Sequence, residues 1–493
     1  MKIRKSLVSK LTIYTFLFFG ISSASFAQFS GNNLVESQFG QLPNDTSNIT
    51  TLYARTVANY KHKDFKVSGT IEQFYSPREG STYLSVSQFS LQYKKKPLDI
   101  KLGNFYETIG RGSLVRSFEI PGAVLEDLSF RSRHYFNRNI LGLSAKYRHK
   151  NLTTKLVIGK PLNFVFPPTQ GFKIRRVDNI AALYTEYNVK KQTIGVAGMR
   201  HSNSGNNGYY LMTTVSGSVS PSISYYTEVA KNIGDFSIGD FSRNAPYVIY
   251  AGLNFSAGSF GMSIEYKKYN NFIIGSGINE PPALVKEHTY RVLNRSTHVL
   301  QPSNESGYQI ELFYTFPNFS SLTFNNTLAV NNFGERTTFS ESYVEYDFTA
   351  NEIHDIKVFM DYANDPFKSQ KNRISSGAYA DWKISKSSGL TTDYEFQRFE
   401  RLAKTFQNHV MVLGYSFKSK VVGSIVAETS NDSFIIETPS KVWLGINLKY
   451  QLAKSHNLQI FAGERRGGPA CNAGVCYEVL NFKGLELRMT NRF

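Results

Sequence analysis

Apolar and polar residues alternate with a period of two along most of this chain. In YVIYAGLNF, residues 247–255, every second residue from the first is apolar, and the same period recurs in 98–102, 260–266, 308–316 and 442–450. Successive side chains of a β-strand point to opposite faces, so this period predicts strands with one apolar and one polar face. The chain is therefore predicted to be all-β.

Such strands suit a sheet that has lipid on one face and water on the other. Strands of about 10 residues, with short turns on one side and long polar loops on the other, are typical of a transmembrane β-barrel. We predict a large antiparallel barrel of the outer-membrane type, with about 20 to 24 strands and long extracellular loops. The 30 Tyr and 38 Phe suit the aromatic girdles of such a barrel. A secreted β-sandwich or propeller is the alternative, but no repeat of the kind a propeller blade gives is found.

The first 27 residues have the pattern of a secretory signal peptide. A basic stretch, MKIRKSLVSK, precedes the short apolar run 11–23, and small residues lead to a predicted cleavage between Ala27 and Gln28. The apolar run is shorter than the about 20 residues that a membrane-spanning helix needs. We predict a signal peptide at 1–27, a periplasmic or flexible segment at 28–50 and the barrel at 51–493. This organisation indicates the outer membrane of a Gram-negative cell.

The chain is basic, with a formal net charge of +18, or +14 without the four cations of the signal peptide. Nucleic acid is a poor explanation for this excess in an exported protein. Anionic lipid headgroups, or a lumen that favours anions, explain it better.

Residues 103–122, GNFYETIGRGSLVRSFEIPG, break the alternation and carry four charged side chains. These are Glu107, Arg111, Arg116 and Glu119. One interpretation is a loop folded into the lumen, where these charges shape a constriction. The other is an ordinary strand–turn–strand with ion-paired inward residues, and the sequence does not decide between them.

A second irregular stretch, residues 279–304, contains a Pro-Pro pair that could open a helix. Four basic or titratable residues follow at helical spacing: His288, Arg291, Arg295 and His298. On one helix they would share a face, which could bind an anion or, less readily, a metal. A solvated face on an extracellular loop is the plainer interpretation and the favoured one.

The third irregular stretch, residues 463–479, holds both cysteines, Cys471 and Cys476. Two cysteines in an exported protein suggest one disulfide, here one that staples a loop before the last strand. The short loop limits its entropic stabilisation to about 2–3 kcal/mol. A redox site is disfavoured because the spacing is not C-x-x-C.

These three stretches carry a family resemblance. GNFYE…G-x-G…R, PP-x-L-x-x-x-H-x-Y-x-x-L-N-R and RRGG-x-x-C…C-Y resemble a family of uncharacterised Bacteroidota outer-membrane barrel proteins, domain of unknown function 6029. The resemblance covers nearly the whole chain after the signal peptide. It implies an envelope location and a barrel, and it implies no activity, substrate or catalytic residue.

The chain ends in KGLELRMTNRF, an alternating strand that finishes on Phe493. In a closed barrel the last strand pairs with the first, so this strand is expected to form the seam. A terminal aromatic also resembles the signal read by the barrel insertion machinery. Phe493→Asp is therefore expected to impair insertion.

Three classes of function remain. The leading one is a pore or transport barrel for small hydrophilic solutes, with a bias toward anions. The second is a structural or accessory barrel that binds an envelope protein partner in secretion, assembly or surface anchoring. An outer-membrane hydrolase is third, because no G-x-S-x-G, H-E-x-x-H or P-loop motif is present. We expect no enzymatic activity, no cofactor and no nucleic-acid partner; the expected partners are membrane lipid and the insertion machinery.

Overall fold

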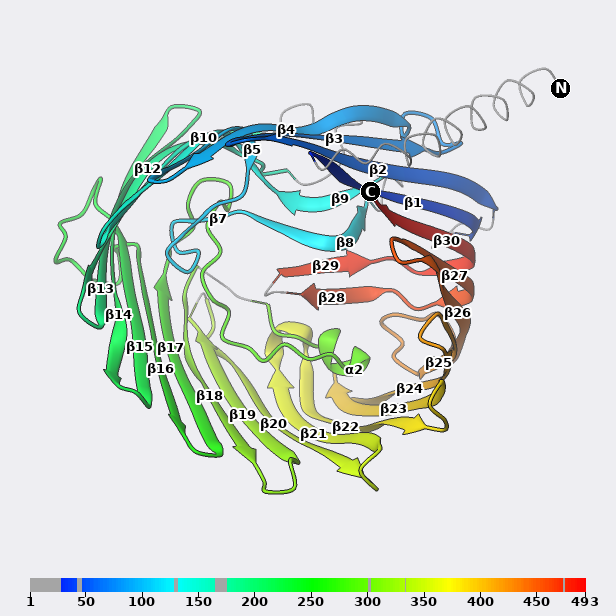
Figure 1. Ribbon diagram of the computed structural model, residues 1–493. Coiled ribbons are helices and arrows are strands. Elements are labelled where there is room, and N and C mark those ends of the chain that lie inside the picture. Colours follow the sequence, from blue (N-terminus) through cyan, green and yellow to red (C-terminus); the bar gives the residue numbers. More distant parts are fainter. Residues whose placement is uncertain are drawn as a thin grey trace, which may run out of the picture.

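The computed structural model describes residues 28–41, 47–127, 132–164, 175–299, 303–332, 334–472 and 475–493, which form a closed β-barrel (Figure 1). The predicted signal peptide lies outside the described residues. No helix in the described part of the chain is long and apolar enough to cross a membrane.

The barrel wall is one antiparallel sheet of 24 strands. The strands are β1 (Phe29–Gln41), β2 (Ile49–His62), β3 (Phe65–Tyr75), β4 (Tyr83–Lys95), β5 (Leu98–Phe105), β10 (Ile140–His149), β11 (Leu152–Pro161), β12 (Asn179–Val189), β13 (Gln192–Asn203), β14 (Asn206–Ser220), β15 (Ile223–Asn232), β16 (Tyr247–Ala257), β17 (Phe260–Asn270), β18 (Glu305–Thr315), β19 (Ser321–Asn331), β20 (Thr337–Ala350), β21 (His354–Asp365), β22 (Gln370–Lys383), β23 (Ser388–Arg401), β24 (Lys404–Phe417), β25 (Val421–Ser430), β26 (Lys441–Ala453), β27 (His456–Arg465) and β30 (Phe482–Arg492). Each wall strand pairs with the next one around the ring, which confirms the predicted fold class and the upper end of the predicted strand number.

The sheet closes where β30 pairs with β1, in a register that runs from Asn32 opposite Arg492 to Gln41 opposite Lys483. Phe493 follows the seam, and its ring stacks on that of Phe29 with 5.8 Å between the centroids. A side chain at Gly31 would collide with the Val57 main-chain carbonyl and with the Phe493 ring, so glycine is required there. The predicted seam is confirmed, whereas the role of Phe493 in insertion stays a prediction.

The predicted N-terminal segment 28–50 is wrong as a separate region, because β1 lies in it and belongs to the wall. The barrel therefore begins at Phe29 and not at residue 51. The alternation missed β1 because its outward parity includes Gly31, Asn33 and Ser37, which leave little apolar signal. Hydrogen bonds to β2 and β30 fix this strand where the hydrophobic pattern does not.

The two faces of the wall differ as the alternation predicts. On β24, Met411 and Leu413 point outward and are 56% and 43% exposed, whereas Asn408 and Val410 point inward and are buried. Exposed large apolar side chains recur on the outward parity of most wall strands. In a membrane barrel this face contacts the acyl chains, so its exposure is favourable.

The two rims of the barrel carry different connections. The first and last described residues, Gln28 and Phe493, and two-residue turns such as 63–64, 150–151 and 190–191 lie at one rim. The opposite rim carries the long connections, and the described residues of three of them fold into the barrel: those within 106–139, 271–304 and 466–481. In outer-membrane barrels the long loops are extracellular, and here all three segments enter from the rim that carries the long connections.

The described residues of these three connections form a unit inside the barrel that we call the plug. It contains β6 (Thr108–Ile109), β7 (Val115–Arg116), β8 (Phe118–Glu126), β9 (Arg133–Arg138), α2 (Arg291–Asn294), β28 (Gly468–Asn472) and β29 (Val475–Val479). Figure 1 shows these elements within the ring of wall strands. The 3₁₀ turn η1 (Pro366–Lys368) lies between β21 and β22.

Candidate functional site

The first and second plug segments are joined by main-chain hydrogen bonds and an ion pair. Arg116 N–H donates to the Ile278 carbonyl at 3.0 Å, and Glu280 N–H donates to the Gly112 carbonyl at 2.9 Å. The Arg116 guanidinium lies 3.8 Å from the Glu280 carboxylate. A Cβ at Gly112, where φ is +100°, would collide with the Glu280 carbonyl, so the close approach requires glycine.

The first and third plug segments share an apolar core. Phe136 of β9 and Tyr477 of β29 have ring centroids 5.4 Å apart. The cluster around them consists of Phe118, Ile120, Ala123, Leu125, Phe136, Val475 and Tyr477. The plug therefore has a small hydrophobic core of its own inside a polar lumen.

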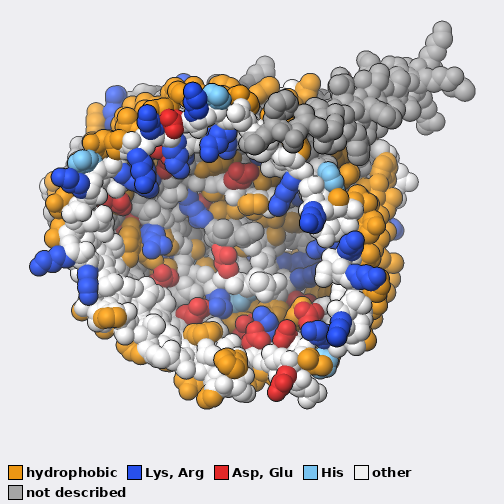
Figure 2. Space-filling view, in the orientation of Figure 1, with side chains coloured by type: hydrophobic (Ala, Val, Ile, Leu, Met, Phe, Trp, Pro, Cys, Tyr) orange, Lys and Arg blue, Asp and Glu red, His pale blue; other side chains and the backbone are white. Residues whose placement is uncertain are grey.

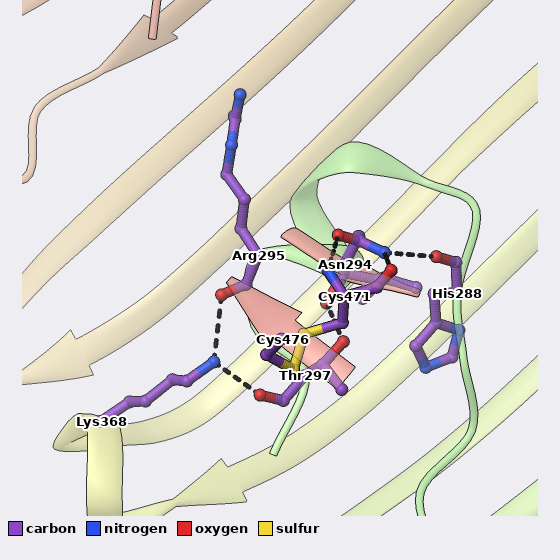
Figure 3. The surroundings of a disulfide bond; sticks show 8 residues. His288, Asn294, Arg295, Thr297, Lys368, Cys471 and Cys476 are labelled. Atoms are coloured by element: carbon purple, nitrogen blue, oxygen red, sulfur yellow. Dashed lines mark hydrogen bonds between the residues drawn. A yellow bond between two sulfur atoms is a disulfide. The ribbon is translucent and has the colours of Figure 1, made fainter. Parts of the chain in front are cut away.

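The second and third plug segments meet at Asn294 (Figure 3). Its side-chain amide donates to the carbonyls of Cys471 at 2.9 Å and His288 at 3.1 Å, and accepts from Cys471 N–H at 2.9 Å. Cys471 is bonded to Cys476, which confirms the predicted disulfide, and the bond joins β28 to β29. One asparagine thus couples α2 to the disulfide-bonded hairpin.

The predicted residues of the first segment lie in the lumen, as one of the two interpretations required. Glu107 pairs with Lys155 at 2.8 Å, and Glu119 pairs with Arg55 of β2 at 3.2 Å. These wall cations neutralise both carboxylates, so Glu107 and Glu119 fix the segment to the wall and do not form a ring of free charge. The ion pairing expected from the alternative interpretation is therefore present as well.

Arg111 contacts wall strand β15. Its main-chain N–H donates to Glu228 Oε2 at 2.8 Å, and its guanidinium lies 4.7 Å from the centre of the Tyr226 ring. Arg111 and Arg116 both line a cavity of about 620 Å³ between the first and second plug segments. Both arginines therefore border space within the lumen.

The predicted shared helical face of the second segment is wrong. Only Arg291–Asn294 are helical, and His288 and His298 lie outside the helix. His288 Nε2 is 3.4 Å from Glu341 Oε2, and His298 Nε2 is 3.2 Å from Glu305 Oε2. Carboxylates fixed on different wall strands hold the two histidines, and both are buried instead of solvated.

The carboxylate of Glu395 accepts from the first turn of α2. Its oxygens lie 3.0 Å from Arg291 N and 2.8 Å from Val292 N. A carboxylate at a helix N-terminus satisfies main-chain donors that have no partner within the helix. The wall thus determines where this short helix forms.

Arg291 and Arg295 point toward one wall carboxylate, that of Glu428 on β25. Their guanidinium nitrogens lie 3.5 and 2.6 Å from its oxygens. They border a cavity of about 330 Å³ that also contacts Trp443 and Arg466. We call it the arginine cavity; it lies between the plug and β25–β27.

A buried charge network missed in the sequence holds the plug to the wall. Arg373 is 0% exposed, and its guanidinium lies 2.9 Å from Glu341 and 3.3 Å from Asp361. It also donates to the Ser296 carbonyl of the plug at 3.2 Å. The charged residues on the polar parity of β20–β22 were the only sequence signal of this network, and they did not reveal its partners.

Lys368 of η1 supplies a further link. Its ammonium donates to the carbonyls of Arg295 at 3.0 Å and Thr297 at 2.7 Å (Figure 3). Burial lowers the pKa of Lys368 to about 8, and the neighbouring Asp365 opposes that effect.

The rest of the lumen is polar, and its charges are unevenly distributed. A cavity of about 620 Å³ beneath α2 has an acidic excess, with five carboxylates and two cations in its lining: Asp347, Asp355, Asp381, Asp393, Glu395, Arg291 and Lys357. On another part of the wall, a cavity of about 360 Å³ has a basic excess, with Arg55, Lys66, Lys101 and Glu119 in its lining. Figure 2 shows the recess at one end of the barrel, with charged side chains of both signs on its wall.

Two further histidines make contacts outside the plug–wall network. His354 Nδ1 accepts from Lys383 N–H at 3.1 Å, whereas its neighbour Asp355 borders the acidic cavity, because successive side chains of a strand point to opposite faces. His201 Nε2 lies 2.7 Å from Asp178 at the edge of the second plug segment. Within the described residues, no group of three or more His, Cys, Asp or Glu side chains could hold a metal.

Comparison with solved structures identifies similar barrels. A cryo-EM structure of an E. coli P pilus tip assembly intermediate, PapC-PapD-PapK-PapG, gives a TM-score of 0.53 at 9% identity, covering 96% of this chain and 62% of that chain. The P pilus usher PapC translocation pore gives 0.47 at 8% identity, over 94% and 99%. OprD from Pseudomonas aeruginosa gives 0.38 at 10% identity, over 68% and 88%. These likenesses concern the fold alone.

Comparison by sequence matches this chain to one family model. The model of a family of unknown function, DUF6029, matches residues 53–392. The search of curated proteins gave no match.

Proposed function

The chain belongs to the DUF6029 family of unknown function, and on that premise we propose that it is a plugged transport barrel of the outer membrane for small hydrophilic solutes, with a bias toward anions. The observation that carries the proposal is the lumen itself. Within the plug, and between the plug and the wall, lie cavities of about 330 to 620 Å³ that are bordered by charged side chains. Cavities of this size suit small solutes.

Charges on and beside the plug support the bias toward anions. Arg111, Arg116 and Arg138 border one cavity together with two glutamates, Glu280 and Glu287, and four arginines and two glutamates border the arginine cavity. Fixed positive charge in a low-dielectric passage raises the local concentration of anions. The acidic cavity beneath α2 opposes this effect, so the preference is expected to be moderate.

Recording from purified protein in a planar bilayer tests the transport proposal. Discrete conductance steps are expected, with a reversal potential in a salt gradient that indicates anion preference. A barrel that remains silent under all applied voltages would count against transport.

Substituting Arg111 and Arg116 tests the source of the anion preference. Arg111→Ala and Arg116→Ala remove positive charge from the cavity between the first two plug segments, so the reversal potential should move toward that of a non-selective pore. Lys63→Ala, at the opposite rim in a two-residue turn, is the control. An unchanged reversal potential in both plug variants would contradict this source of selectivity.

A structural or accessory barrel is the second candidate, and the buried links between plug and wall favour it. Charges such as Arg373 and Glu341 are costly to separate, which suits a plug that stays in place. In that case an envelope protein should co-purify from gently solubilised membranes, and the isolated barrel should not conduct. We infer a non-enzymatic role in either case; hydrolysis of lipid or peptide substrates by the purified protein would overturn it.

A further inference from the structure

The arginine cavity has an excess of positive charge. Four arginines and two glutamates line it: Arg291, Arg295, Arg465, Arg466, Glu428 and Glu464. Glu464 pairs with Lys441 at 2.6 Å, and Arg465 pairs with Glu486 at 3.2 Å, so these four charges balance. Arg291 and Arg295 share the carboxylate of Glu428, so within this cavity two guanidinium groups face one carboxylate. Arg291 also borders the acidic cavity beneath α2.

Arg466 adds a further positive charge. Its guanidinium donates to the amide oxygen of Asn408 at 3.1 Å and forms no ion pair with a carboxylate among the described residues. Burial and the positive charge of Arg295 lower the pKa of Arg466 to about 10, although the carboxylates of Glu428 and Asp432 oppose that effect. A buried guanidinium beside another arginine is unfavourable unless an anion joins it.

Trp443 supplies an unused donor at the same place. The side chain is only 3% exposed, and its indole Nε1–H has no acceptor in the part of the chain that the structure describes. The Arg466 guanidinium lies 5.5 Å from the centre of the Trp443 ring. A buried indole usually finds an acceptor, so this N–H also indicates a missing group.

We propose that the arginine cavity binds a small organic anion through a carboxylate or phosphate group. The oxyanion accepts hydrogen bonds from the guanidinium groups of Arg291 and Arg466 and from the indole N–H of Trp443. Planar guanidinium donors match both oxyanions. The organic part of the ligand lies against the apolar walls that Val426 and Phe461 provide. This site rests on the proposed transport function, in which it would be a binding station for solute beside the plug.

Trp443 makes the site observable. The sequence contains two tryptophans, and the other one, Trp382, lies on the outer face of β22 and is 37% exposed. In a Trp382→Phe variant the fluorescence therefore reports on the cavity alone. Glucuronate, glucose 6-phosphate and glucose are suitable probes, since they share a sugar ring and differ in the oxyanion.

Titration of this variant in detergent should give a saturable fluorescence change with glucuronate, glucose 6-phosphate or both, and none with glucose at equal ionic strength. Whichever anion binds distinguishes a carboxylate site from a phosphate site. Arg466→Gln should raise the Kd at least tenfold, whereas Arg466→Lys, which keeps the charge but loses the planar donors, should have a smaller effect. Arg398→Gln is the matched control, because Arg398 is exposed on β23 and does not line the cavity.

Three results would overturn the site: no saturable change with either anion, an equal response to glucose, or unaltered affinity in Arg466→Gln. Far-UV circular dichroism verifies that each variant retains its sheet. Because the titration needs no solute flux, failed binding with intact bilayer conductance would remove the site and leave the transport proposal standing. Binding without conductance would support the site and count against the transport proposal.

Discussion

Arg373 shows, at the scale of one residue, how the wall and the plug depend on each other. It lies on β22, its partners Glu341 and Asp361 lie on β20 and β21, and its bond to the Ser296 carbonyl reaches the plug. All three charged side chains are buried. Their attraction offsets the cost of removing them from water only while the set is complete.

Replacing Arg373 with Met should therefore be strongly destabilising. The substitution leaves two buried carboxylates without their cation, for which a loss of about 3–5 kcal/mol is expected. Guanidinium unfolding in detergent, followed by tryptophan fluorescence, measures the change. Arg398→Met, an exposed position on β23, is the matched control and should shift stability by less than about 0.5 kcal/mol. Equal midpoints for Arg373→Met and the parent would show that the network contributes little.

His134 of β9 should make the stability of the plug depend on pH. Burial lowers the pKa of His134 well below its usual value, and the positive charge of Arg175 acts in the same direction. The unfolded chain then takes up a proton below pH of about 6.5 while the folded plug does not. The contribution of neutral His134 to the free energy of unfolding of the plug should be fully present above that pH. Below it, this contribution should fall by up to about 1.4 kcal/mol per pH unit.

Hydrogen exchange of the β8–β9 peptides at pH 7 and pH 5, corrected for intrinsic rates, measures this loss. His134→Leu should remove the pH dependence, whereas His62→Leu, at the exposed end of β2, should keep it. A parent protein whose β8–β9 protection is the same at both pH values would contradict the assignment.

At the scale of elements, the sequence marked the segments where the chain leaves the wall but did not predict that they form a plug. The described residues of the three irregular stretches lie inside the barrel, apart from those at the ends of β5 and β27. A strand pattern cannot continue where the chain leaves the wall. The disulfide followed from the cysteine count alone. The wall partners of the second plug segment could not be predicted. Glu341, Glu395 and Glu428 are 53 to 137 positions away along the chain from the plug residues that they contact, and only the folded sheet brings them near.

Tertiary contacts also explain why residues 288–298 do not form the predicted helix. Spacing of i, i+3 and i+7 is necessary for a shared helical face, but it does not set the helix length. Glu395 caps the chain at Arg291, and Asn294 is occupied by Cys471, so α2 is a single turn. Tertiary contacts decided where the helix begins and ends, and one sequence does not reveal them.

The disulfide hairpin predicts a local effect of reduction. Cys471 and Cys476 are five positions apart, so the bond contributes at most about 2–3 kcal/mol through loop closure. Reduction should speed hydrogen exchange in β28 and β29, and also around Asn294, which bonds to Cys471. The wall strands β27 and β30 should keep their protection.

Exchange measured with and without dithiothreitol provides this comparison. A Cys471→Ser/Cys476→Ser variant should match the reduced parent and show no response to the reagent. Unchanged protection of the hairpin after reduction would mean that its contacts with Asn294 and β8 suffice.

At the scale of the whole molecule, the strand number determines why a plug is needed. Barrel diameter grows with strand number, and barrels of 16 to 18 strands already leave an aqueous channel. A 24-stranded wall without inner segments would therefore enclose a wide opening. Alternation along single strands indicated the barrel, and closure of its last strand on its first was expected. It did not identify β1 as the first strand or give the register of β1 with β30, which joins positions at opposite ends of the chain.

Removing one plug segment should thus widen the passage without opening the wall. Phe105 of β5 is already opposite Ile140 of β10, so replacing residues 107–138 with Asn-Gly preserves the register of these strands. The single-channel conductance of this variant should rise several-fold above that of the parent, and its anion preference should fall with the loss of Arg111 and Arg116. Deleting residues 235–241, in the exposed connection between β15 and β16, is the control and should leave conductance unchanged. If the shortened barrel keeps its sheet content yet conducts no better than the parent, the first segment does not obstruct the passage, and the plug is a support for the wall.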